Sequence, residues 1–364
     1  MVEDKRNYGI DLLRIFSMFM VVILHLLGGG GMLGASASNV SGNRILWLIE
    51  IACYCAVNCY AIVSGWVGYK SKFKFTNIIV LWLQVFFYSF LINLIFLLAG
   101  WQDLSLGSIK SMFFPAMNKE YWYFTAYFIM YMFIPVLNLL LDKFNKKQMG
   151  VFLGIGFIAF SLLPTFLMED PFSLMCGYSA WWLAYLYLVG GFLNKYKVFS
   201  RGSVFDYLTY YGCLVLFTFL SKVNLEYLTP KLFGEVRYSM MFVEYTSPTI
   251  LFCGIFLVIA FSKMKFNGFF NKLISFFAPI SFGVYLIHCN NLMLGKFWVG
   301  SFSKFTDYRI IKMVLYVFVL ALLVYLICSL IDYIRHLLFK LFRVKEFILK
   351  LENKYAKDLF KISD

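Results

Sequence analysis

The chain has 364 residues, of which 62% are hydrophobic, 21% are aromatic and only 14% are charged, with a formal net charge of +14. Soluble domains carry about 25% charged residues, so this composition excludes an ordinary soluble fold and favours an integral membrane protein. The apolar runs are about 20 residues long, which suits membrane-spanning helices and not the shorter strands of a barrel.

Successive apolar runs with short gaps predict an all-α membrane protein with about ten transmembrane helices in one bundle. We expect one polytopic membrane domain over residues 1–333 and a basic amphipathic cytoplasmic tail over residues 334–364. The expected spans are 9–28, 44–66, 75–99, 121–141, 149–167, 177–193, 204–221, 243–262, 273–293 and 310–332.

The positive charges lie in short clusters between the apolar runs. Roughly two thirds of the Lys and Arg residues fall at alternate connections, which is the pattern that orients membrane proteins with their basic loops inside. This predicts a multi-pass protein of the cell (plasma) membrane with both termini in the cytoplasm. Nucleic acid is not expected as a partner, because the Lys and Arg clusters lie between the spans, where they orient the protein in the membrane. The apolar stripe and Lys/Arg residues of the tail predict a helix on the anionic inner leaflet, so membrane lipid is an expected partner.

The first span carries two ionisable residues, Arg14 and His25, which are costly at membrane depth and therefore mark a site or a pathway. Eleven helical steps place both on one face, separated by about 16 Å along the axis. The planar guanidinium of Arg14 suits phosphate. A neutral imidazole at His25 can take a proton from a hydroxyl.

The second span holds Glu50 in its outer part and ends in Ser64-Gly65-Trp66 before Lys70 and Lys72. Glu50 is expected to partner a histidine or a basic residue. Ser64 and Gly65 allow helix backbones to approach closely. The lysines either bind phosphates or anchor the topology.

The later spans add aromatic residues and a second histidine. Trp122 and Tyr123 open the fourth span, as an interfacial aromatic belt or as a wall for stacking against a sugar. His288, one turn after Tyr285, is expected at a depth similar to that of His25. The two histidines would form either a base with its orienting partner or a clamp for substrate. No metal site is expected, because the Cys53, Cys55 and Cys59 cluster has no nearby histidine at zinc spacing.

Several of these residues form short motifs that keep one order along the chain: Asn7 to Leu13 followed by Arg14-x10-His25; Asn58 through Ser64-Gly65-Trp66; Trp122-Tyr123-Phe124 with Pro135; and Ser281-Phe282-Gly283-Val284-Tyr285-Leu286-Ile287-His288. Together they resemble the acyltransferase 3 family of integral membrane O-acyltransferases. One departure is that lysines follow Ser64-Gly65 where many members carry arginines.

The resemblance implies transfer of an acyl group, with acetyl expected, from cytoplasmic acyl-CoA to a hydroxyl of a cell-surface or lipid-linked glycan. His25 would be the catalytic base, and Arg14, Lys70 and Lys72 would bind the donor phosphates. Acyl-CoA would be a co-substrate and no cofactor would be bound permanently. The oxyanion donor would be Tyr285 or Asn58. The alternative is a glycan-precursor transporter or flippase with an Arg/His relay. The oligomeric state is left open.

Overall fold

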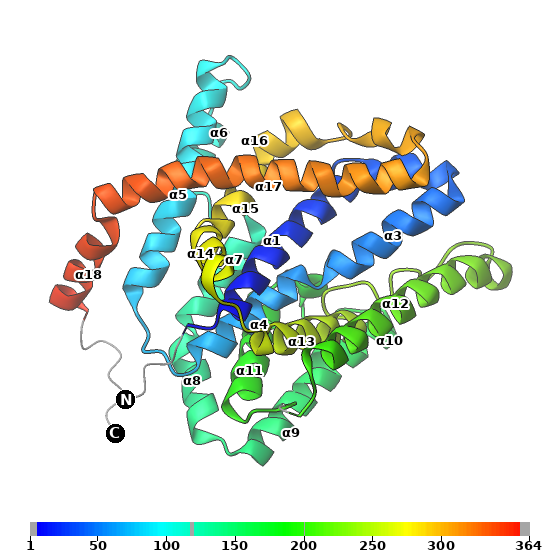
Figure 1. The fold of residues 1–364 in the computed structure, drawn as a ribbon, viewed down its shortest axis with the longest axis horizontal. Coiled ribbons are helices and arrows are strands. Elements are labelled where there is room, and N and C mark those ends of the chain that lie inside the picture. Colours follow the sequence, from blue (N-terminus) through cyan, green and yellow to red (C-terminus); the bar gives the residue numbers. More distant parts are fainter. Residues whose placement is uncertain (1–5, 117–119, 200, 357–364) are drawn as a thin grey trace.

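The computed structural model describes residues 6–116, 120–199 and 201–356 (Figure 1). Within these ranges the regular structure is helical and no strand is present, which confirms the expected all-α membrane fold. The α-helices are α1 (Tyr8–Leu27), α2 (Met32–Ala35), α3 (Val40–Tyr54), α4 (Ala56–Gly68), α5 (Phe75–Leu98), α6 (Leu106–Phe113), α7 (Trp122–Met132), α8 (Ile134–Lys143), α9 (Lys146–Phe157), α10 (Leu163–Leu167), α11 (Ala180–Lys195), α12 (Val204–Phe233), α13 (Pro248–Lys263), α14 (Gly268–Phe277), α15 (Ser281–His288), α16 (Asn291–Met293), α17 (Ile310–Leu341) and α18 (Val344–Tyr355).

Each of the expected spans falls on a helical segment. By length and apolar composition, seven helical stretches of the described chain can cross a membrane, and the bent pair α7 and α8 makes an eighth. The two other expected spans are α11 and α13, of 16 residues each, shorter than the roughly 20 residues that a crossing requires. By this measure the structure supports seven or eight crossings where the sequence suggested about ten.

Helix α1 occupies the centre of the bundle and packs against α3, α4, α13, α14, α15 and α17 (Figure 1). Its start is fixed by Asn7, whose side-chain oxygen accepts a hydrogen bond from the Ile10 amide at 3.1 Å. Such a cap satisfies an amide that the first helical turn would otherwise leave unpaired. Since α1 continues unbroken to Leu27, Arg14 and His25 do share one rigid helix.

Two glycines bring α4 and α11 into close contact. A β-carbon at Gly65 would lie 1.8 Å from the Tyr187 carbonyl oxygen, and one at Gly190 would lie 1.9 Å from the Ile62 carbonyl oxygen. The helices can therefore pack this closely only where the side chain is a hydrogen atom. The expectation that Ser64-Gly65 permits close backbone approach holds for Gly65, while the Ser64 hydroxyl donates to the Tyr60 carbonyl at 2.9 Å.

The fourth expected span is a bent pair, because α7 and α8 meet at an angle of 54°. The bend falls at Phe133, two residues before Pro135. Proline lacks the amide hydrogen and its ring crowds the preceding turn, which explains why one apolar run becomes two helices. Helix α11 contacts both helices of the bent pair.

The last span is longer than expected. Helix α17 continues across residues 333–334, the expected domain boundary, and ends at Leu341. Its extension contains Arg335, which was expected in the basic tail but is 5% exposed and pairs with buried Asp332. Tyr88 also donates to Asp332, at 2.8 Å. A charge buried in this way requires a partner. The ion pair neutralises both charges within α17, and the hydrogen bond from Tyr88 joins this part of α17 to α5.

The amphipathic tail helix begins later than expected, at α18, and it is anchored to α5. The Glu352 carboxylate accepts hydrogen bonds from the Phe75 amide at 2.7 Å, from the Thr76 amide at 2.9 Å and from the Thr76 hydroxyl. These are the unpaired donors at the start of α5, where a negative charge is favoured. Burial raises the pKa of Glu352, but the hydrogen bonds outweigh it and place the pKa below its usual value. The expected tail residues 357–364 lie outside the described residues.

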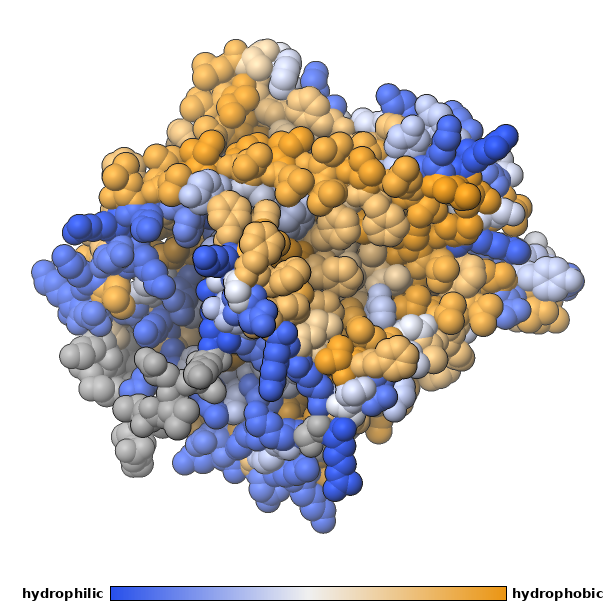
Figure 2. Space-filling model, viewed as in Figure 1, coloured by the Kyte–Doolittle hydropathy of each residue, from blue (hydrophilic) through white to orange (hydrophobic). Residues whose placement is uncertain are grey.

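Figure 2 shows a broad apolar surface over α17 and the helices beside it, with a large group of hydrophilic residues at the lower left and bottom of the view and a smaller group at the upper right. On α17 the exposed apolar side chains include Ile311, Leu315 and Leu330, which are 84%, 59% and 64% exposed. A large apolar surface of this kind is stable in contact with lipid.

Candidate active site

Two histidines from distant parts of the chain meet inside the bundle. His25 lies in the last turn of α1 and His288 is the last residue of α15. His25 Nδ1 and His288 Nε2 are 3.0 Å apart, within hydrogen-bond distance. The sequence placed both at a similar depth, and the structure brings them into direct contact.

The surroundings of His288 fix the direction of this hydrogen bond. His288 Nδ1 lies 2.5 Å from the Val284 carbonyl oxygen, which can only accept, so Nδ1 carries the hydrogen. In neutral His288 the other nitrogen, Nε2, is then an acceptor, and His25 Nδ1 donates to it. This leaves His25 Nε2 with a lone pair and with no hydrogen-bond partner among the described residues. An imidazole held this way is prepared to accept a proton.

Cys289 is the third member of this cluster, and no sequence pattern indicated it. Its sulfur lies 3.2 Å from His25 Nδ1 and 3.2 Å from His288 Nε2. Cys289 is 6% exposed and caps the end of α15. The contact depends on α1 and α15 lying side by side, which residue spacing within either helix does not reveal.

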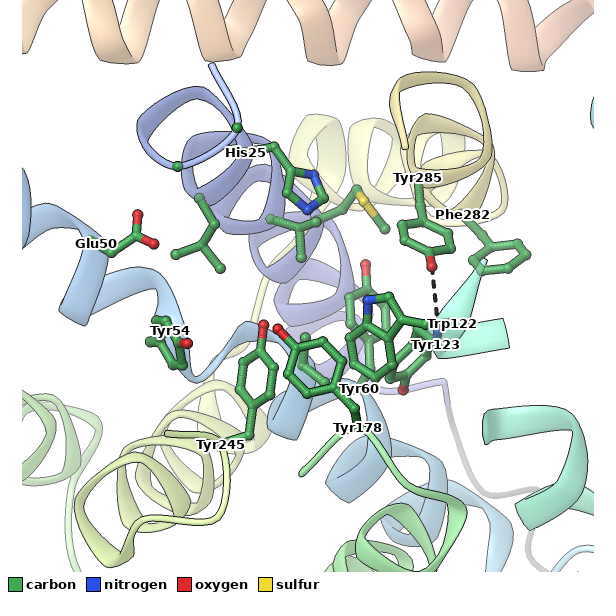
Figure 3. A pocket seen from close by; sticks show the side chains of 16 residues that line it. His25, Glu50, Tyr54, Tyr60, Trp122, Tyr123, Tyr178, Tyr245, Phe282 and Tyr285 are labelled. Atoms are coloured by element: carbon green, nitrogen blue, oxygen red, sulfur yellow. Dashed lines mark hydrogen bonds between the residues drawn. The ribbon is translucent and has the colours of Figure 1, made fainter. Parts of the chain in front are cut away.

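His25 forms part of the wall of a cavity of about 210 Å³, shown in Figure 3. Glu50 of α3 lies on the opposite side of the view from Tyr285 and Phe282 of α15. The rest of the wall is largely aromatic. The aromatic lining residues are Tyr54, Tyr60, Trp122, Tyr123, Tyr178, Tyr245, Phe282 and Tyr285.

The aromatic side chains of the cavity contact one another. The rings of Trp122 and Tyr178 are 4.3 Å apart, those of Tyr178 and Tyr245 are 5.2 Å apart, and those of Tyr54 and Tyr245 are 4.9 Å apart. The sequence identified Trp122 but not Tyr178 or Tyr245, which come from loops before α11 and α13. Rings arranged in this way present flat faces and hydroxyl groups to a ligand such as a sugar.

Polar atoms in the cavity are few. The Glu50 side chain is buried, and its Oε2 has no hydrogen-bond partner among the described residues. The Tyr285 hydroxyl oxygen accepts a hydrogen bond from the Tyr123 amide at 3.4 Å, so its own hydrogen remains available to donate. Buried polar groups are normally paired, so the Glu50 oxygen is a candidate contact for a ligand.

Asn58 lies outside this cavity. Its amide nitrogen donates to the Tyr245 carbonyl at 2.8 Å, and its amide oxygen accepts from the Trp182 indole at 3.1 Å. These bonds hold the loop that carries Tyr245 against α4 and α11. Asn58 therefore supports the cavity wall, and among the two expected oxyanion donors only Tyr285 lines the cavity.

Arg14 lies beneath the cavity, toward the start of α1. The ring of Tyr60 lines the cavity, and its hydroxyl donates a hydrogen bond to the Arg14 carbonyl at 2.6 Å. The Arg14 guanidinium pairs with buried Asp11 at 2.9 Å, and Arg6 pairs with the other oxygen of Asp11 at 2.6 Å. One carboxylate between two guanidinium groups leaves a net positive charge, which suits an anionic ligand.

A basic depression of about 490 Å³ opens at the same end of α1 as Arg14. Its cationic lining consists of Arg6, Lys70, Lys197 and Lys263. A neighbouring depression of about 580 Å³ shares Lys70 and Lys197 and adds Lys72 and Lys195. Lys70 and Lys72 therefore lie at this basic end, whereas Arg14 lines neither depression. The sequence pointed to the lysines after Gly65, but the cations contributed by α11 and α13 meet them only in the fold.

An apolar groove of about 910 Å³ adjoins the aromatic cavity. It lies between the bent pair α7–α8 and the start of α11, and Trp122 and Tyr178 line both the groove and the cavity. Ile129, Val136 and Trp181 on its walls are 48%, 53% and 61% exposed. A long apolar chain fits such a groove, and the two shared aromatic side chains would separate it from a polar head in the cavity.

Comparison with known proteins gives one family match. A family model described as an acyltransferase domain matches residues 7–333, which is nearly the whole chain. Comparison with curated proteins and with solved structures gives no match.

Proposed function

The chain belongs to the acyltransferase 3 family and is a membrane acyltransferase, and on this premise we propose that it carries out O-acylation across the bilayer. The acyl group, acetyl in our proposal, comes from acyl-CoA on the cytoplasmic side. The acceptor is a hydroxyl of a cell-surface or lipid-linked glycan. The protein is a multi-pass protein of the plasma membrane with both termini in the cytoplasm. The observation that carries the proposal is the His25–His288 pair at the wall of the aromatic cavity.

The donor would bind at the basic end of α1. Coenzyme A carries several phosphate groups, and the cations around Lys70 and Lys197, together with Arg14, suit them. Arg14 lies about 16 Å below His25 along α1. The narrow pantetheine arm would run over this distance and bring the thioester into the cavity.

His25 would act as the general base. Its Nε2 takes the proton from the acceptor hydroxyl, and the oxygen attacks the thioester carbonyl. The tetrahedral intermediate carries a negative oxygen, which the free hydrogen of the Tyr285 hydroxyl would stabilise. The carbon–sulfur bond then breaks, and the thiolate of coenzyme A takes the proton back from His25. A positioned base accelerates such a step by about 10²–10⁴-fold.

The acceptor would bind against the aromatic wall, with a sugar ring stacked on Trp122 or Tyr178 and its hydroxyls near Glu50. The adjoining apolar groove supports a lipid-linked acceptor among the glycans proposed. Its lipid would lie in the groove while its sugar enters the cavity past Trp122 and Tyr178.

The test uses purified protein in detergent, radiolabelled acetyl-CoA and glycan acceptors with and without a lipid carrier. We expect label on the glycan with wild-type protein and a loss of about 10²–10⁴-fold with His25→Ala. Without a membrane to cross, a transporter would leave the glycan unlabelled. If no acetyl group is transferred but the protein moves glycan across the membrane of liposomes, the proposal is overturned in favour of the transporter.

The role of Arg14 has its own test. Arg14→Lys keeps the charge but loses the planar fork, so the dissociation constant for coenzyme A should rise while acceptor binding stays unchanged. Arg44→Ala on α3 is the control, since Arg44 is exposed and lines neither basic depression. Equal affinity for coenzyme A in Arg14→Lys, Arg14→Ala and wild type would exclude Arg14 from the donor site.

A further inference from the structure

The cluster beside the aromatic cavity contains three potential metal ligands. His25 Nδ1, His288 Nε2 and Cys289 Sγ are separated by 3.0, 3.2 and 3.2 Å. All three atoms are among the preferred ligands of Zn²⁺. They come from the end of α1 and the end of α15, so the packing of these helices fixes their arrangement.

The separations are close to those of a tetrahedral zinc site. With Zn–N of about 2.0 Å and Zn–S of about 2.3 Å, tetrahedral angles place two nitrogens about 3.3 Å apart and nitrogen and sulfur about 3.5 Å apart. The observed triangle is smaller by only a few tenths of an ångström on each side. Small rotations of the two imidazoles and the thiol would therefore complete three of the four positions of the ion, and the fourth could be filled by water.

For His288 the second ligand shell is also present. A histidine that binds zinc usually donates its other ring hydrogen to a carbonyl or carboxylate, which fixes the tautomer and the ring orientation. His288 does this through Nδ1 and the Val284 carbonyl at 2.5 Å. His288 therefore presents the Nε2 lone pair to the cluster even before an ion arrives.

We propose that His25, His288 and Cys289 form a binding site for Zn²⁺ or a similar divalent transition metal, and that occupancy switches off proton transfer by His25. The binding site stands on the geometry of the cluster. Only the inhibitory effect rests on the proposed acyl transfer.

The protonation changes explain the inhibition. The ion binds the lone pair of His25 Nδ1, so the hydrogen of that imidazole moves to Nε2. The Cys289 thiol loses one proton to solvent, and His288 keeps the hydrogen on Nδ1. With Nε2 protonated, His25 cannot accept a proton from a hydroxyl. Metal binding thus removes the base through a change of tautomer and small rotations of the three ligand side chains.

The expectation that the chain has no metal site rested on Cys53, Cys55 and Cys59, which have no nearby histidine at zinc spacing. Among the described residues, the group whose ligand atoms converge is His25, His288 and Cys289. The sequence did not indicate it, because its two helices are separated by more than half of the chain. His288 and Cys289 are adjacent, but they form a site only when His25 joins them.

The binding test uses Co²⁺ as a spectroscopic probe with the purified, chelator-treated protein in detergent. Wild type should bind Co²⁺ with tetrahedral ligand-field bands and a thiolate-to-cobalt charge-transfer band, and Zn²⁺ should displace it. Cys289→Ser should lose the charge-transfer band and bind at least about 100-fold more weakly, since even second-shell changes cost about 10–100-fold. Cys253→Ser is the matched control, because Cys253 is also buried but lies on α13. It should behave as wild type.

The inhibition test measures acyl transfer against free Zn²⁺, each variant relative to its own metal-free rate. Wild type and Cys253→Ser should be inhibited and should recover with chelator, whereas Cys289→Ser should need at least about 100-fold more Zn²⁺. No thiolate band in wild type, or the same band in Cys289→Ser, would overturn the metal site whether or not the protein transfers acyl groups. A thiolate band with undiminished transfer would overturn the inhibitory role and leave the acyltransferase proposal intact.

Discussion

Replacing His288 tests the proposal that it holds His25 in the correct tautomer. His288 is 1% exposed and is fixed by the Val284 carbonyl. In His288→Ala, His25 Nδ1 loses the acceptor that now lies 3.0 Å away. The His25 ring can then rotate, or it can carry its hydrogen on Nε2. Either change leaves no Nε2 lone pair directed at the hydroxyl of the glycan substrate.

The size of the effect follows from the hydrogen bond that is lost. Leaving a buried donor without its acceptor costs about 1–3 kcal/mol, which corresponds to roughly tenfold to hundredfold in rate. We therefore expect kcat to fall by about that factor, with little change in KM for the donor. His288→Gln provides an amide oxygen that can accept from His25 Nδ1, so it should recover part of the rate.

The assay is transfer of radiolabel from acetyl-CoA to acceptor by purified variants whose thermal unfolding and elution on gel filtration match those of wild type. His25→Ala sets the lower limit, about 10²–10⁴-fold below wild type. The double variant His25→Ala, His288→Ala should be no slower than His25→Ala alone. A residue that only orients His25 has no further effect once His25 is removed. Losses that multiply in the double variant, or full activity in His288→Ala, would refute the orienting role.

Three further predictions concern the supporting structure. In Asn58→Leu, two buried hydrogen bonds are lost, so the free energy of unfolding should fall by about 1–3 kcal/mol per unpaired group. The KM for the glycan acceptor should rise because Tyr245 shifts. If neither quantity changes, Asn58 does not support the cavity wall. Gly65→Ala should reduce the yield of folded protein on gel filtration, because its β-carbon would meet the α11 backbone at 1.8 Å, whereas Gly212→Ala, with no atom within 4 Å, should match wild type. Because the pKa of Glu352 is lowered in the folded protein, its stabilisation of the docked α18 is present above its ordinary pKa of 4.5 and is lost as the pH falls through the folded pKa. Hydrogen exchange over residues 344–355 should therefore rise at acidic pH in wild type and be high at all pH values in Glu352→Ala.

Some parts of the site follow from local rules that the sequence already contains. The spacing of Arg14 and His25 predicts one face of one helix, because helical periodicity depends only on residue number. Apolar runs predict where helices form, because a segment inside the bilayer must satisfy its backbone hydrogen bonds internally and a helix does so. Exact spans were less accessible: Pro135 bends one run into two helices, and the Asp332–Arg335 pair carries α17 past its expected end.

The remainder depends on packing between distant segments. The sequence by itself determined an all-α membrane protein, the family motifs, and the arginine and histidine on the first span. Only the tertiary structure decided that His288 and Cys289 touch His25, that Tyr178 and Tyr245 complete the aromatic wall, and that Asn58 supports this wall from outside. The physical reason is that these contacts join α1, α15 and two loops through close side-chain packing. Helix periodicity fixes which face a residue occupies, but it does not specify which other helix that face will meet.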